Sequence, residues 1–142
     1  MSAFLIPNFR KKVINIDPQR EIFIAIRTAI KNLGYDVFDT VLPPENTPYP
    51  FVYIGYAQQL DTRTKTQIIG EVHQRIDVWH SNPERRGDVS DMMLKIKQVC
   101  RAIRRTTNRS VDVTLENQTI SEDKSTGITL MRGMLEFKIN FS

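Results

Sequence analysis

The stretch from Thr47 to Ile103 constrains the fold of this chain most, because it sets out two strands and a helix in order. Pro48 and Pro50 hold the backbone extended into an apolar segment over 51–56, whose alternation leaves both faces substantially apolar. A longer segment over 68–79 alternates apolar and polar side chains, as a strand does. We therefore expect two neighbouring strands, the first of them inside a sheet.

Two polar segments of the chain are predicted to project as loops. Residues 57–67 are rich in threonine and lie between the two expected strands, where a loop or hairpin tip belongs. Residues 116–127 combine acidic, hydroxyl and glycine residues and precede the last apolar segment. We expect both segments to be projecting loops.

The first helix is predicted over 18–33. Asp17 suits the N-cap position and Pro18 the first helical position, where its missing N–H costs nothing. Gly34 stands where a left-handed residue ends many helices. An apolar stripe with helical spacing is formed by Ile22, Ala25, Ile26, Ala29, Ile30 and Leu33.

A second helix is predicted after the turn-rich loop over 81–87, with Asp88 or Ser90 as its cap. Its apolar stripe consists of Val89, Met92, Met93, Ile96, Val99, Cys100 and Ile103. Cys100 is the single cysteine, so no disulfide can form within the chain. Its place on the stripe predicts a buried, unreactive thiol.

Three further strands complete the expected fold. A short one is predicted over 35–41, and alternating patterns predict half-buried antiparallel strands over 111–116 and 131–141. The chain of 142 residues is expected to be a single α+β domain, 1–142, with an N-terminal arm over 1–16. The fold class is a mainly antiparallel sheet with two amphipathic helices packed on one face.

Composition excludes several classes of protein. The apolar fraction of 40% and charged fraction of 25% are those of an ordinary globular protein, and no apolar run is long enough to cross a bilayer. The N-terminus lacks the basic region and cleavage site of a signal peptide. The net charge of +4 admits nucleic acid as a partner, but a solvated basic face explains it more simply.

One pattern has the residue types of a metal-dependent nuclease. Glu136 and Lys138 form a Glu-x-Lys pair, and Asp123 lies upstream; two carboxylates and a lysine are the groups such catalysis needs. The pair also suits the solvent face of any strand, and Asp123 falls in an expected loop. We expect no catalytic residues here, and the nuclease remains a minor alternative.

No other segment predicts a cofactor or metal site. His73 and His80 fall on opposite faces of a regular strand and have no carboxylates at metal-ligand spacing. The six glycines are dispersed and form no phosphate-binding loop. We therefore expect no metal, no cofactor and no enzymatic activity.

The order of these motifs resembles the tail-completion, or tail-terminator, family of long-tailed bacteriophages. The resemblance is carried by the Pro-Tyr-Pro-Phe-Val-Tyr entry over 48–53 and the Gln-Arg-Ile-Asp-Val-Trp strand end over 74–79. The loop over 81–87 and the Met-Met-Leu of the following helix over 92–94 complete it. The Thr-rich segment near Asp61 departs from the family's pattern.

The resemblance implies a structural virion protein, assembled in the host cytoplasm and located in the tail at the head–tail interface. It implies a hexameric ring on the head-proximal end of the tail tube that ends tube polymerisation and meets the head connector. Its partners would be copies of itself, the tail tube protein and a head–tail connector or head-completion protein. Genomic DNA would pass the lumen without specific binding, so lumen-facing residues are expected to be polar or acidic on balance.

Contacts between subunits and with partners are expected at polar loops and at aromatic or arginine side chains. The candidate interface residues are Thr62, Arg63, Thr64, Lys65, Trp79, Arg85 and Arg86. The alternatives to a terminator are another head–tail connector, head-completion or tail-tube ring protein and, less favoured, a basic nucleic-acid-binding or nuclease domain.

Overall fold

The computed structural model describes residues 17–39, 43, 46–63 and 68–142. The expected arm over 1–16 and the candidate interface residues Thr64 and Lys65 lie outside the described residues. The elements are α2 (Pro18–Asn32), β1 (Val37–Phe38), β2 (Phe51–Arg63), β3 (Ile68–His80), α3 (Arg86–Arg101), β4 (Val111–Asp123) and β5 (Leu130–Phe141).

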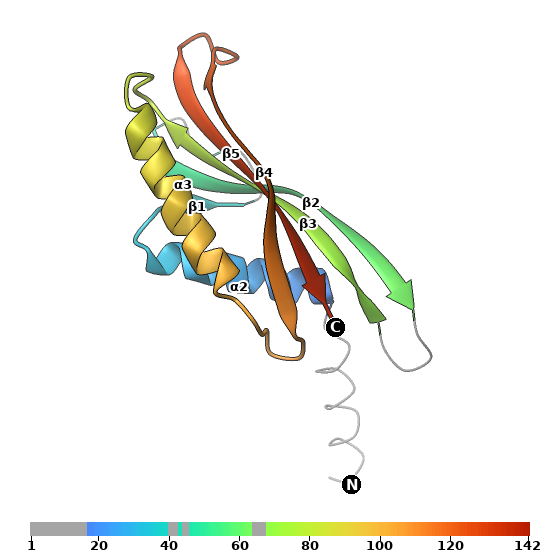
Figure 1. Ribbon diagram of the computed structural model, residues 1–142. Coiled ribbons are helices and arrows are strands. Elements are labelled where there is room, and N and C mark those ends of the chain that lie inside the picture. Colours follow the sequence, from blue (N-terminus) through green and yellow to red (C-terminus); the bar gives the residue numbers. More distant parts are fainter. Residues whose placement is uncertain (1–16, 40–42, 44–45, 64–67) are drawn as a thin grey trace, which may run out of the picture.

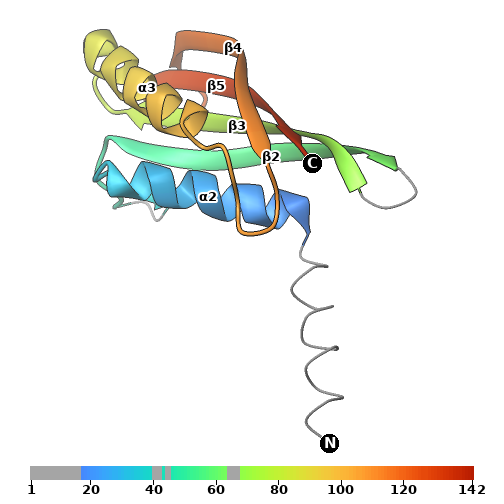
Figure 2. The same cartoon turned by 60° about the horizontal axis from the view of Figure 1, so that its bottom comes forward.

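The described strands form one sheet in the order β1-β2-β3-β5-β4 (Figure 1). Neighbouring strands are antiparallel except β1 and β2, which pair in parallel through two residues. A single buried cluster contains side chains from both helices together with one face of β2 to β5. The predicted α+β class is therefore confirmed, with a mostly antiparallel sheet and, among the described residues, two helices (Figures 1 and 2).

Helix α2 agrees with its sequence signals. It begins at Pro18, its buried stripe includes Ile22, Ile26 and Ile30, and Gly34 follows its end with a φ of 92°. Asp17 occupies the N-cap position, but its side chain makes no capping hydrogen bond. The predicted end at Leu33 is off by one residue, because Leu33 is the C-cap.

Helix α3 begins earlier than predicted, at Arg86, with Arg85 as the N-cap residue. Asp88, an expected cap, instead lies in the first turn, where its carboxylate interacts favourably with the positive end of the helix dipole. It also lies 2.9 Å from Nε of Arg85. Ile103 lies beyond the helix end but still packs against the core.

Both predicted projecting loops are largely wrong. Residues 57–63 belong to β2, and residues 116–123 belong to β4. Their backbones pair with β3 and β5 through strand hydrogen bonds. Such pairing requires backbone donors and acceptors and does not require apolar side chains. Only the turn after Asp123 remains of the second loop. The strand expected over 35–41 is reduced to Val37–Phe38 among the described residues.

Close packing of α3 on β5 depends on Gly133. A Cβ at this glycine would lie 2.5 Å from Sδ of Met93 and 2.8 Å from Cγ1 of Val89. Both of those α3 side chains are fully buried. The missing side chain therefore lets α3 approach the sheet closely, and both described helices pack on this one face of it. Among the described residues, no helix is long and apolar enough to span a membrane.

Candidate functional site

The face of β2 to β5 opposite the helices, here called the helix-free face, carries most of the sheet's charged side chains. Strand register and ion pairs assign to it the acids Glu71, Asp77, Asp112, Glu116, Asp123 and Glu136 and the bases Arg75, Arg132 and Lys138. Acidic side chains therefore outnumber lysines and arginines on this face.

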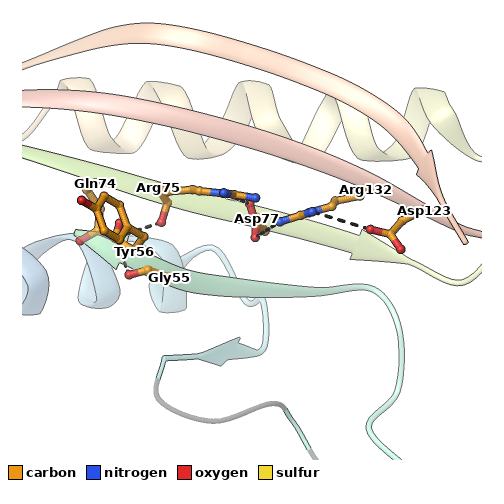
Figure 3. Close-up of polar contacts among 7 residues, drawn as sticks. All are labelled: Gly55, Tyr56, Gln74, Arg75, Asp77, Asp123 and Arg132. Carbon is orange, nitrogen blue, oxygen red and sulfur yellow. Dashed lines mark hydrogen bonds and ion pairs between the residues drawn. The ribbon is translucent and has the colours of Figure 1, made fainter. Parts of the chain in front are cut away.

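Asp77 is the centre of the polar network on the helix-free face, and it is only 5% exposed. Its Oδ2 accepts a hydrogen bond of 2.9 Å from Nη2 of Arg132, and its Oδ1 one of 3.2 Å from Nε of Arg75. Arg132 also lies 3.7 Å from Asp123 on the edge strand (Figure 3). Two arginines thus neutralise a buried carboxylate that would otherwise be costly.

Trp79, a predicted interface residue, is part of the same network. The guanidinium carbon of Arg132 lies 4.8 Å from the centroid of its ring, within the range of a cation–π contact. The ring is only partly buried. Trp79 therefore has a contact within its own subunit and keeps some surface for another.

Asp123 is held in its charged form. The hydroxyl and backbone N–H of Ser125 both donate to Oδ1, and they lower the pKa of the carboxyl, with a smaller effect from Arg132. Partial burial opposes this shift. The hydrogen bonds also close the turn between β4 and β5, so charge and turn geometry support each other.

A second cluster on the helix-free face surrounds His73. Its Nδ1 lies 2.7 Å from Glu116 of β4, and its Nε2 lies 3.3 Å from Glu71. Lys138 lies 4.0 Å from the same Glu71 carboxylate. Every lysine and arginine assigned to this face thus has a carboxylate within 4.0 Å.

Two β-bulges lie at the same level of the sheet. In β2, the pairing jumps from Ile54 to Ala57, and in β4 it jumps from Leu115 to Asn117. The extra residue in β4 is Glu116, which reaches across β5 to His73. Bulges bend a strand and redirect a side chain, and here the redirected side chain is a carboxylate.

Gln74 stabilises the bulge in β2 from the core side. Its buried amide nitrogen lies 3.2 Å from the carbonyl oxygens of Gly55 and Tyr56 and 3.0 Å from that of Arg75 (Figure 3). The bulge disrupts the ladder at these positions, so their carbonyl groups would otherwise be poorly paired. This explains a polar residue in an apolar row.

The structure does not bring the predicted interface residues together. Thr62 and Arg63 end β2 and pair with the beginning of β3, whereas Arg85 and Arg86 follow the other end of β3. The two groups therefore lie at opposite ends of a 13-residue strand. They cannot form one patch, and they remain predictions for two separate contacts.

The nuclease pattern is not assembled either. Asp123 pairs with Leu130, six residues along β5 from Glu136, which corresponds to roughly 20 Å. Asp123 is bound by Ser125 and Arg132 instead. Among the described residues, no three histidine, cysteine or acidic side chains are placed to hold a metal ion.

The sheet has two open edges in the described part of the chain. The outer edge of β4 has no neighbouring strand, and β1 covers β2 only at Val52 and Tyr53. Backbone groups on such edges are available to another strand. These edges are two different surfaces on opposite sides of the sheet.

Sequence reasoning missed Asp77, Arg132 and Gln74 as partners. The alternation over 68–79 puts Asp77 and Trp79 on the same face, but the pairing of Asp77 with Arg132 depends on the register between β3 and β5. Gln74 had a visible signal, because it interrupts the apolar row of Val72 and Ile76. A buried glutamine in such a row needs hydrogen-bond partners, and here the carbonyl groups at the β2 bulge provide them.

Comparison of the sequence with protein-family models and with curated proteins gave no match. Comparison of the fold with solved structures found a chain described as "Virion of native gene transfer agent (GTA) particle". The two chains share 13% sequence identity and a TM-score of 0.66, over 87% of this chain and 93% of the other. At this identity, the likeness shows a common fold.

Proposed function

We propose that this chain is a structural protein of a phage-like virion, a tail terminator whose subunits form a hexameric ring at the head-proximal end of the tail tube. The ring ends tube polymerisation and joins the tail to the head connector. The observation that carries this proposal is the fold likeness to a chain of a gene transfer agent virion, which covers nearly all of both chains. The resemblance to tail terminators, carried by the segments over 48–53, 74–79, 81–87 and 92–94, supplies the specific role.

The two open sheet edges support a ring of identical subunits. A closed ring is built from heterologous contacts, in which one surface of a subunit meets a different surface of the next. The edge of β4 and the uncovered edge of β2 are two such surfaces. Their free backbone groups supply contacts without any catalytic or ligand-binding site.

The helix-free face suits a lumen through which DNA passes. Its carboxylates outnumber its lysines and arginines, and those bases already have carboxylate partners. Electrostatic attraction of DNA phosphates depends on lysines and arginines whose charge is not already neutralised. We therefore place this face towards the lumen, and DNA passes it without specific binding.

Native mass spectrometry of the purified chain across a concentration series tests the ring. A discrete hexamer with no larger species is expected. Assembly without limit would favour a tail-tube subunit. A monomer at every concentration would contradict the claim that free subunits form a ring on their own. Adding preformed tails to such a monomer then tests whether the ring forms only on the tube end.

Head–tail joining tests the role of the two arginines at the start of α3. Both Arg85 and Arg86 are exposed, so replacing each by glutamate should block joining without unfolding the subunit. Lys95→Glu, at another exposed position of α3, is the matched control. Normal joining by the double variant would remove these arginines from the connector contact.

DNA binding tests the lumen assignment. The wild-type ring should bind a short DNA duplex weakly at physiological salt, and Thr114→Lys with Glu136→Lys should raise its affinity and salt dependence. Both positions lie on the helix-free face. The same gain from lysines at Ser90 and Asp91 of α3 would show that the face is not special.

A further inference from the structure

The outer side of α2 forms a groove that neither the core nor the helix-free face uses. It has a volume of about 610 Å³ and lies between α2 and the loop that leads to β4. Its lining includes Ile24, Ala25 and Ala29 of α2 and Thr106 of the loop. Ile24 is 48% exposed although it lies in a concave surface. We call this surface the α2 groove.

Two arginines give the α2 groove its charge. Arg20 and Arg105 both line it, and neither has an ion pair with a described carboxylate. Glu21 also lines the groove, but its carboxylate lies 3.3 Å from Arg109 and accepts a hydrogen bond from the backbone of Asn108. The groove therefore offers an apolar floor beside positive charge.

The complementary feature is the turn between β4 and β5. Ile128 in this turn is 60% exposed, although it is a large apolar side chain. Two acidic residues, Glu122 and Asp123, immediately precede the turn, and Lys124 is the single base within it. The turn projects beyond the last pair of the ladder, Asp123 with Leu130. We call residues 122–128 the β4–β5 tip.

One subunit cannot insert its own tip into its own groove. The loop that lines the groove ends where β4 begins, and the tip follows the end of β4, 13 residues later. A strand of that length spans roughly 40 Å. Figure 1 shows the β4–β5 turn and the loop after α3 at opposite ends of the molecule.

We infer that the β4–β5 tip of one copy of this chain docks in the α2 groove of a second copy. Ile128 packs on Ile24, and the carboxylate of Glu122 lies near Arg20 and Arg105. Burial of two exposed isoleucines drives the contact, and opposite charges fix its orientation. The contact is heterologous, because tip and groove are different surfaces. This inference rests on the proposed ring only because both require copies of the chain to associate.

Disulfide capture between two single variants tests the contact. The full-length variants Ile24→Cys and Ile128→Cys are mixed under mild oxidation. If the tip docks in the groove, the two cysteines lie within disulfide distance, and a covalent dimer containing one copy of each variant is expected. The natural Cys100 is buried and free, so it stays unreactive in both. Leu94→Cys mixed with Ile128→Cys is the control, since Leu94 is 49% exposed on α3.

Charge reversal makes the test specific. Arg105→Glu in the groove variant should reduce the yield of the mixed dimer about tenfold, and Glu122→Arg in the tip variant should restore it. Circular dichroism of each variant confirms that it is folded. A mixed dimer no more abundant than the Leu94→Cys control, or one indifferent to both charges, would overturn the inference.

The result is separable from that of the proposed ring. A hexamer in native mass spectrometry without the Ile24–Ile128 crosslink would leave the ring standing and refute this contact. The crosslink in species that grow without limit would keep the contact and refute the terminator. A chain that neither assembles nor crosslinks on its own or on tails would refute both.

Discussion

Arg132 and Asp77 form a diagonal pair across two neighbouring strands. Asp77 stands opposite Met134 in the register, and Arg132 stands opposite Trp79, yet Nη2 of Arg132 reaches Oδ2 of Asp77 at 2.9 Å. The diagonal path lays the guanidinium over the Trp79 ring on the way. One arginine thus links β3 to β5 through a charge and an aromatic contact.

Asp77→Asn should therefore destabilise the fold. The substitution keeps the shape of the side chain but leaves Arg132 and Arg75 without their shared charge. Loss of one partner of a buried pair costs about 3–5 kcal/mol, and the partial exposure of both arginines should reduce the cost to about 2–3 kcal/mol. Urea unfolding followed by circular dichroism measures it. Asp112→Asn, at an exposed site, should change the free energy of unfolding by less than about 0.5 kcal/mol.

Gln74→Met should cost about 1–3 kcal/mol, because methionine has nearly the same shape but no N–H for the carbonyl groups at the β2 bulge. The free energy of unfolding from urea denaturation checks this. Gln98→Met on the exposed side of α3 is the control and should be close to neutral. Equal stability of the two variants would mean that the bulge carbonyls find other partners.

Gly133→Ala should destabilise by about 1–3 kcal/mol, since the new methyl group would press against Met93 and Val89 in a packed core. The matched control is Gly87→Ala in the first turn of α3, where a Cβ meets nothing within 4 Å. That change should be neutral or stabilising, because alanine favours a helix. In thermal unfolding, the midpoint temperature of Gly133→Ala should fall below that of the wild type, whereas that of Gly87→Ala should stay the same or rise.

Cys100 should be unreactive in the native protein, because burial raises the pKa of its thiol to about 12. A thiol reagent at pH 8 should modify it only at the rate of unfolding or local opening. In the unfolded chain the thiol regains the ordinary pKa of a cysteine, 9.0, and ionises above it, whereas in the native state it stays protonated. Stability should therefore fall above about pH 9, by at most about 1.4 kcal/mol per pH unit.

The alkaline effect can be isolated with Cys100→Ala. This variant loses packing at all pH values, but it should lack the part of the alkaline slope that comes from the thiol. Identical slopes for wild type and variant between about pH 9 and the native pKa of about 12 would show that Cys100 does not carry the effect.

Local signals were sufficient for the first helix. Pro18 at its start and Gly34 after its end are signals that depend only on the local sequence, and the ends of α2 agree with them to within a residue. The polar half of β2 had no such signal. Residues such as Gln58 and Thr62 are strand residues because β3 pairs with them, and that pairing lies outside any local window.

The charged network was beyond sequence reasoning for the same reason. The outward positions of β3 were readable from alternation, but the diagonal pairing of Asp77 with Arg132 links residues 55 apart in the chain. Glu116 was harder still, because a bulge directs it towards His73. A regular strand would not have placed it there. Alternation fixes which face a side chain is on, and only register fixes its partner.

The uneven distribution of charge between the two sides of the sheet has a consequence for handling the protein. The chain's isoelectric point near 9.4 is an average over an acidic helix-free face and a basic remainder. On a cation-exchange resin at neutral pH, a free subunit should adsorb through its helical side and leave its acidic face towards the buffer. An assembled ring with that face inside would present its net basic side and elute at higher salt, so chromatography alone would separate the two forms.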